Sequence, residues 1–209
     1  MRPKYVLLST GGLLAVAALA ALAAAQTARR TPDQIRASYE SHKNDFDYLL
    51  GDWEFTAQSK EWGKHHGYWS AVRLDGGQVL DEYRVVGDNG ETYNLSTTLR
   101  AYNAIRDQWE LISVGQSDGL QDFGTARREG ADMLIEQTFG AMSEKPSIWR
   151  IRYHDIQPDR FLWNANCSSD RGKTWEKDCL QIEAHRIGGA RSLGPLAPSQ
   201  KRPARSPAR

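Results

Sequence analysis

The fold is decided by the segment DFDYLLGDWEFTA, residues 45–57. In its first half, apolar residues such as Phe46 and Leu49 have the three- and four-residue spacing of a helical face. After Gly51, apolar residues beginning with Trp53 alternate with polar ones, as in a half-buried strand. The apolar period therefore changes at Gly51, which predicts a short helical plug that turns a corner into the first strand.

From Trp53 onward, short runs rich in aromatic and β-branched residues are separated by turn sequences such as DGG and SDG. We expect strands at about residues 52–58, 67–74, 78–86, 92–102, 109–116, 120–128, 133–139, 148–154, 160–167 and 174–187. Strands in hairpin order form an antiparallel meander, and closing a meander removes its exposed edges. The predicted fold is all-β, an antiparallel up-and-down β-barrel of about ten strands, with a β-sandwich as the alternative.

A short N-terminal helix is predicted to precede the barrel. Thr31 is a suitable N-cap, Pro32 suits the first helical position, and Gln34 can complete a capping box. We expect this helix to run for about ten residues and to close one end of the barrel.

Residues 1–25 have the three parts of a secretory signal peptide. Arg2 and Lys4 precede an apolar run over residues 6–22, and three alanines follow before the chain becomes polar. An uncleaved membrane anchor is the alternative, because the run is nearly long enough to span a bilayer. The sequence thus predicts a periplasmic or secreted protein.

The remaining chain divides into three parts. We expect a linker and the short helix in residues 26–44, a barrel domain in residues 45–187, and a disordered, basic, Pro-rich tail in residues 188–209. Seven of the 27 Lys and Arg residues lie in the signal peptide and the tail, whereas none of the 26 acids does, so the remainder carries a net charge of about −6. Because an exported chain meets little nucleic acid, we expect no nucleic-acid partner, and membrane contact only through the signal segment or weakly through the tail.

Near the C-terminal end, Cys167 and Cys179 flank the segment SSDRGKTW, residues 168–175. This segment matches the Asp-box hairpin of sialidase propellers, but one copy predicts a turn and not a propeller. We expect Asp170 to accept hydrogen bonds from the turn's backbone amides and Trp175 to cover the hairpin. In an exported chain the two cysteines predict a disulfide. Their positions are offset by about three residues around the turn, so the bridge requires a bulge or a wider turn.

Three short motifs resemble the calycin-like barrels, which include lipocalins, fatty-acid-binding proteins, nitrobindin-like proteins and bacterial secreted families of unknown function. The segment LGDW, residues 50–53, resembles the lipocalin Gly-x-Trp opening strand, and Arg186 is similar in place to the arginine that stacks on that Trp. The segment SDRGKTW resembles the hairpin of the bacterial group. The resemblance implies that Arg186 packs on Trp53, and the strand number is closer to the fatty-acid-binding and nitrobindin-like barrels.

The resemblance to nitrobindin-like proteins would imply haem binding, but this chain lacks the sequence feature typical of that group. Trp53 is followed by Glu54 and not by that group's Gly-rich segment. We expect no cofactor, and His185, on the last strand, is the axial candidate if a haem is bound. The sequence also contains no nucleophile elbow, zinc-ligand spacing or phosphate-binding Gly loop. We therefore predict neither catalytic residues nor a metal site.

The strongest indication of function is the aromatic content of the predicted strands, with seven Trp, eight Tyr and five Phe in the chain. Alternate residues of a barrel strand face inward, so some of these rings line the interior. Ordinary core packing is the alternative. The candidate ligand-binding aromatics, each in a different predicted strand, are Trp69, Trp109, Trp149 and Trp163.

Arg150 and Arg152 share one face of a predicted strand. If that face is internal, the two arginines could bind an anionic head group; if it is external, they are a solvated face. We expect binding of a small hydrophobic or amphipathic molecule. An isomerase or hydrolase on the same fold, or a structural or interaction protein with a filled barrel, are the alternatives.

Overall fold

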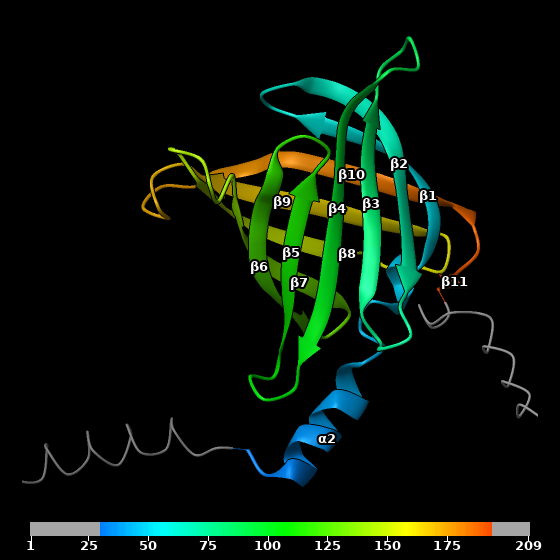
Figure 1. Ribbon diagram of the computed structural model, residues 1–209. Helices are drawn as coiled ribbons and strands as arrows, with labels where there is room; N and C mark the ends of the chain where they lie inside the picture. Colours follow the sequence, from blue (N-terminus) through cyan, green and yellow to red (C-terminus); the bar gives the residue numbers. More distant parts are fainter. Residues whose placement is uncertain (1–29, 194–209) are drawn as a thin grey trace, which may run out of the picture.

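The computed structural model describes residues 30–193. The predicted signal peptide and residues 194–209 of the predicted tail lie outside this range, whereas residues 188–193 are described and include strand β11 (Arg191–Ser192). The described chain contains helix α2 (Pro32–His42), the 3-10 helix η1 (Asp47–Leu49) and a series of strands (Figure 1). The strands are β1 (Gly51–Ser59), β2 (Gly63–Arg73), β3 (Val79–Val86), β4 (Thr92–Asn103), β5 (Gln108–Gly115), β6 (Gly119–Glu129), β7 (Asp132–Phe139), β8 (Ser147–His154), β9 (Arg160–Ser168), β10 (Glu176–Gly188) and the two-residue β11 (Arg191–Ser192).

Strands β1 to β10 form a closed antiparallel barrel. Each pairs with its neighbour in sequence, and β1 also pairs with β10, which leaves none of the ten at an open edge. Trp53 of β1 lies opposite Trp69 of β2 on one side and Arg186 of β10 on the other. The prediction of an all-β, ten-stranded up-and-down barrel is confirmed, and the β-sandwich alternative is wrong. The short β11 adds a parallel pairing to β2.

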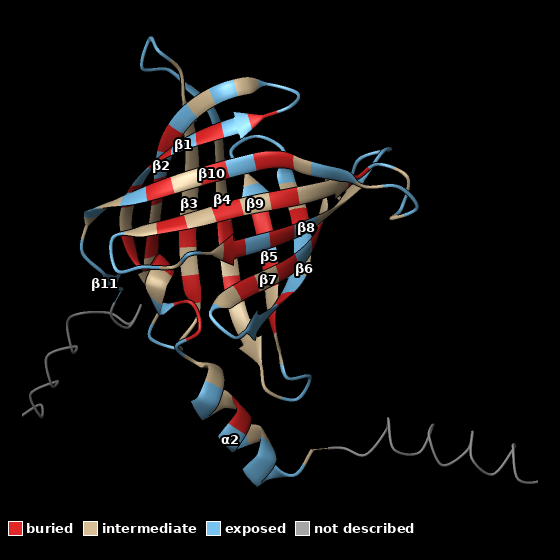
Figure 2. Cartoon of the chain, turned by 180° about the vertical axis from the view of Figure 1, so that it is seen from behind, coloured by how far each residue is buried: buried red, intermediate tan, exposed pale blue. Residues whose placement is uncertain are grey.

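Buried and exposed residues alternate along the strands, as the bands of colour in Figure 2 show. In β1 the buried positions include Trp53, Phe55 and Ala57, which point into the barrel, whereas Glu54 and Thr56 face solvent or the outer surface. This two-residue period is the one that the sequence of this strand predicts.

One end of the barrel, here called the plug end, is closed by the segment 45–50. Phe46 and Leu49 are fully buried, and the Phe46 ring meets Trp109 edge-on with 5.0 Å between ring centroids. Gly51 has a φ of +112°, and a Cβ there would come within 2.6 Å of the Gly188 carbonyl oxygen. Only glycine fits this corner without strain. The plug therefore meets strand β1 at Gly51, and the apolar period changes there from helical to extended.

Arg186 fastens the plug to the barrel. Its guanidinium carbon lies 4.0 Å from the centroid of the Trp53 ring, which is the cation–π contact that the resemblance implied. The same guanidinium donates hydrogen bonds to the backbone carbonyls of Tyr48, Leu50 and Pro158. The Trp53 indole donates to the Leu49 carbonyl over 2.8 Å. The Arg186 guanidinium is partly desolvated, and this burial lowers its pKa. Several carbonyl acceptors hold the planar guanidinium in this position.

Helix α2 has the predicted N-terminus, with Thr31 as N-cap and the capping box to Gln34 present on both sides. It does not close the barrel as expected. Figure 1 shows it extending away from the plug end, and Ser38 is its only buried residue. The reason is that its surface is too polar to fill an apolar opening, whereas Phe46 and Leu49 fill it well. Within residues 30–193, no helix is long and apolar enough to cross a membrane.

The β9–β10 hairpin contains the predicted disulfide between Cys167 and Cys179, whose Cα atoms are 6.0 Å apart. The register between the strands shifts between Glu176 and Leu180, so β10 bulges, and this bulge corrects the offset that the sequence indicated. Asp170 accepts hydrogen bonds from the backbone amides of Lys173 and Thr174, both over 2.9 Å. These bonds, with that from the Thr174 side chain foremost, lower the pKa of Asp170 to about 2.

Candidate functional site

The barrel is hollow toward the end opposite the plug, here called the open end. The space measures about 2450 Å³, a value that includes room above the rim and along the outer surface of β8 to β10. Its rim carries exposed side chains such as Trp62 and Met142. Small-molecule pockets measure about 300–1,000 Å³, so even part of this hollow is large enough for a ligand.

One wall of the hollow is polar. It is formed by inward-facing positions of five successive strands, β3 to β7, and all six side chains are at least nine-tenths buried. Buried polar groups cost free energy unless they are hydrogen-bonded or paired, so a wall of this kind requires partners. The six residues are Asp81, Thr98, Arg100, Ser113, Asp122 and Gln137.

The deepest polar group is an ion pair between Asp81 and Arg100. Asp81 also accepts a hydrogen bond from the Trp69 indole over 2.7 Å. The Nε atom of Arg100 is buried and has no hydrogen-bond partner among the described residues. The pair is neutral overall, and it leaves one donor available for a water molecule or a ligand atom.

Nearer the open end, the Thr98 and Ser113 hydroxyls lie 2.9 Å apart. Asp122 follows on β6, directly opposite Ser113 in the register. The Gly140 backbone amide donates to its carboxylate over 3.2 Å. Burial nevertheless raises the pKa of Asp122 to about 6, against the opposing effects of Gly140, Gln137 and Ser113.

The opposite wall is apolar and aromatic. Ile151 and Leu180 are buried there. The Trp149 ring on this wall is tilted against the ring of Phe139, which lies on β7 at the border with the polar wall, with centroids 4.3 Å apart. Tyr153 closes the floor toward the plug, and its complete burial raises the pKa of its hydroxyl to about 12. The interior is therefore amphipathic, with polar groups on one side and apolar groups on the other.

The structure brings only some of the predicted ligand-binding residues together. Trp69, Trp149 and Trp163 line the hollow. Trp109 does not: it is buried at the plug end, where its indole lies 3.3 Å from the Asp45 carboxylate. The strand of Trp109 begins at the plug end, so its first inward residue faces the plug and not the hollow.

Arg150 and Arg152 lie on the outer face of β8. They form ion pairs with Glu136 and Asp132 on β7, and Arg150 also covers the Trp175 ring at 4.2 Å. The external alternative is therefore the one observed, because Trp149, Ile151 and Tyr153 take the inward positions of this strand.

His185, the haem candidate, is also on the outer surface. It is exposed and lies 3.3 Å from the Glu183 carboxylate. An axial ligand must point at a haem held in the interior, so His185 does not fit that role. In residues 30–193 no group of three or more His, Cys, Asp or Glu side chains is placed to hold a metal ion.

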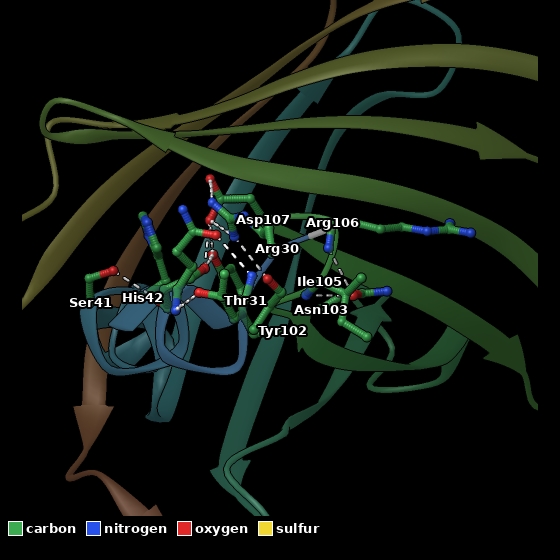
Figure 3. A network of polar contacts seen from close by, with 12 residues as sticks. Arg30, Thr31, Ser41, His42, Tyr102, Asn103, Ile105, Arg106 and Asp107 are labelled. Atoms are coloured by element: carbon green, nitrogen blue, oxygen red, sulfur yellow. Dashed lines mark hydrogen bonds and ion pairs between the residues drawn. The ribbon is translucent and has the colours of Figure 1, made fainter. Parts of the chain in front are cut away.

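A second polar cluster lies at the plug end, between α2 and the β4–β5 turn (Figure 3). Asp107 accepts hydrogen bonds from Arg30, Ser38 and Tyr102, which hold the pKa of its carboxyl well below the usual range. Asp107 has a φ of +59°, at the turn that this network secures. Each of these groups is used to dock the helix, so the cluster has a structural role.

The sequence pattern does not predict the polar wall. Asp81, Ser113 and Asp122 each share the inward parity of a buried apolar residue in the same strand, for example Leu111 with Ser113. The two-residue spacing from a buried apolar residue is the feature of the sequence that places these polar residues on the inward face. It was masked because polar residues inside a run of strand-forming residues usually indicate the solvent face.

Comparisons with known proteins assign no family to the chain. No family model and no curated protein matches the chain. Among solved structures, the chain is similar to one described as the crystal structure of Rv2717c from M. tuberculosis. The sequences are 15% identical, the TM-score is 0.47, and the alignment covers 72% of this chain and 97% of the other.

Proposed function

We propose that the protein binds a small amphipathic molecule inside the barrel. The observation that carries this proposal is the amphipathic hollow, with six buried polar side chains on one wall and aromatic and aliphatic side chains on the other. A barrel whose interior served only for packing would contain apolar side chains throughout, because those stabilise it without needing partners.

The two walls suggest how the ligand is oriented. Its hydrocarbon part packs against Ile151 and Leu180, and its polar part faces β3 to β7. The polar residues are spread from Arg100, deep in the barrel, to Asp122, nearer the open end. Ligand entry is through the open end, since the plug segment and Arg186 block the other.

One observation favours catalysis as a second function. A carboxyl with a pKa of about 6, as in Asp122, is suited to general acid or base chemistry near neutral pH. In the described part of the chain its close polar neighbours are Ser113, Gln137 and the Gly140 amide, none of which titrates near neutral pH. Binding is therefore the function that the geometry supports better.

Native mass spectrometry of protein purified from its own host tests the proposal. We expect a retained small molecule, seen as a mass above that of the polypeptide and released by denaturation. A matched pair of variants on β4 locates it: Ser96→Trp fills the hollow, whereas Thr97→Trp adds the same bulk at the adjacent outward position. Loss of the extra mass in Ser96→Trp alone supports binding inside the barrel. Equal retention by both variants would exclude the interior as the site.

A further inference from the structure

Three carboxylates are buried in the described chain, and they differ in how their charge is balanced. Asp45 contacts the imidazole of His42 over 2.9 Å, and Asp81 is paired with Arg100. Asp122 is only 4% exposed, yet in residues 30–193 no Lys, Arg or His contributes to its pKa, and its neighbours are neutral. Of the buried carboxylates in the described part of the chain, Asp122 alone faces the hollow without a cation.

The surroundings of Asp122 suit a cation in another way. The register of β6 and β7 places Phe123 opposite Thr138, so the inward residues Asp122 and Phe139 are neighbours across the two strands. Phe139 in turn stacks with Trp149 of β8. Aromatic faces attract ammonium groups, most strongly when water is excluded. A carboxylate and two aromatic rings thus converge from adjacent strands on the same region of the hollow.

We infer that the ligand of this barrel carries a positively charged amino group, which pairs with Asp122 and contacts the Phe139–Trp149 pair. This inference rests on the proposed function and specifies its ligand as an amphipathic organic cation. The ammonium supplies the counter-charge that Asp122 lacks in the described chain. The Gln137 and Ser113 side chains donate hydrogen bonds to Asp122, and their own oxygens can accept the remaining hydrogen bonds of the ammonium. The neutral Asp81–Arg100 pair, deeper in the barrel, has no comparable attraction for charge.

The test compares three probes that share one hydrocarbon chain: octylammonium, octanol and octanoate. Their affinities are measured by isothermal titration calorimetry at about pH 8, where the Asp122 carboxylate is ionised. We expect octylammonium to bind about tenfold or more tightly than octanol, and octanoate to bind most weakly, because a charge-assisted hydrogen bond to a buried carboxylate is strong.

Asp122→Asn keeps the shape and an acceptor for the Gly140 amide but removes the charge. We expect it to lose the preference for octylammonium, by about tenfold or more, while binding octanol as the wild type does. Asp118→Asn is the control, because it removes the same charge from an exposed position on the rim loop. Trp149→Leu should weaken octylammonium more than octanol, which separates the aromatic contribution from that of the charge.

The outcomes distinguish this inference from the function on which it rests. Equal affinity of the wild type for all three probes, or a preference for octanoate, overturns the cation and leaves binding of amphipathic molecules intact. A preference for octylammonium that survives in Asp122→Asn also overturns it. Binding of no probe overturns the inference, and the Ser96→Trp and Thr97→Trp pair then decides the proposed function separately.

Discussion

The plug end and the hollow half of the barrel are built from the same ten strands but in opposite ways. At the plug end, Trp53 and Phe46 are fully buried, and Arg186 donates hydrogen bonds to four backbone carbonyls. In the hollow half, among residues 30–193, Asp122 is buried without a cation and the Nε of Arg100 has no hydrogen-bond partner. The first arrangement stabilises the fold, and the second costs stability in the absence of a ligand. This is the difference expected between a closing core and the proposed binding site.

The largest change in the free energy of unfolding is expected when a Trp is removed from each half in turn. Trp53→Ala deletes a fully buried ring at the plug end and should lower the free energy of unfolding by about 3–5 kcal/mol. Trp149→Ala removes a partly exposed ring that lines the hollow, so the loss should be clearly smaller. Urea denaturation followed by circular dichroism measures both. Equal losses would mean that the two halves contribute alike.

The disulfide provides the next largest effect. The double variant Cys167→Ser with Cys179→Ser should lose about 2–3 kcal/mol, because the bridge restricts the unfolded chain over a short loop. Wild-type protein unfolded in the presence of a reductant should show the same loss. Mass spectrometry that finds two free thiols in protein isolated without reductant would reject the bridge.

Asp122→Asn should raise the free energy of unfolding, whereas the preceding variants lower it. Because burial raises the pKa of Asp122 to about 6, above the value of about 3.9 in an unfolded chain, the native state holds the proton more tightly. Wild-type stability therefore falls as the pH rises from about 4 to about 6, and the cost is complete above that range. We expect Asp122→Asn to be more stable than wild type by on the order of 1–3 kcal/mol at about pH 8, and similar to it at about pH 4.

Urea denaturation of both proteins across this pH range checks the prediction. A wild type that is as stable as Asp122→Asn throughout would show that the carboxylate has a counter-charge that compensates for its burial. The same variant loses the cation preference in the binding experiment, so a gain in stability with a loss of binding would identify Asp122 as a functional group.

The smallest effect is expected at the helix. Asp107→Asn should weaken the docking of α2 by less than about 1 kcal/mol, because the Arg30–Asp107 pair is partly exposed and screened by solvent. The lowered pKa of Asp107 means that its contribution is present above about pH 4 and is lost as the pH falls through the folded-state value. Hydrogen exchange of the α2 amides at about pH 7 and about pH 3 would detect the change. Faster exchange at neutral pH in the variant is expected, while the barrel amides should be unaffected.

Part of the architecture was readable from the sequence because it depends on local period and turn chemistry. The alternation after Trp53, the turn sequences and the capping box at Thr31 each correspond to an element of the structure. The partnership of Trp53 with Arg186 was also predicted, but only by resemblance to calycin-like barrels, since nothing local joins residues so far apart in the chain.

The sequence by itself determined the strands, the corner at Gly51 and the hairpin around Asp170, since each is specified by neighbouring residues. Only the tertiary structure decided which face of each strand is internal. It placed Arg150 outside and Asp122 inside, although both are charged residues within strands. A strand's period fixes which residues share a face, but the barrel's closure and register fix which face meets the hollow. The tertiary structure also decided that the plug segment, and not helix α2, closes the barrel, because Phe46 and Leu49 fill the apolar opening better than the polar helix surface does.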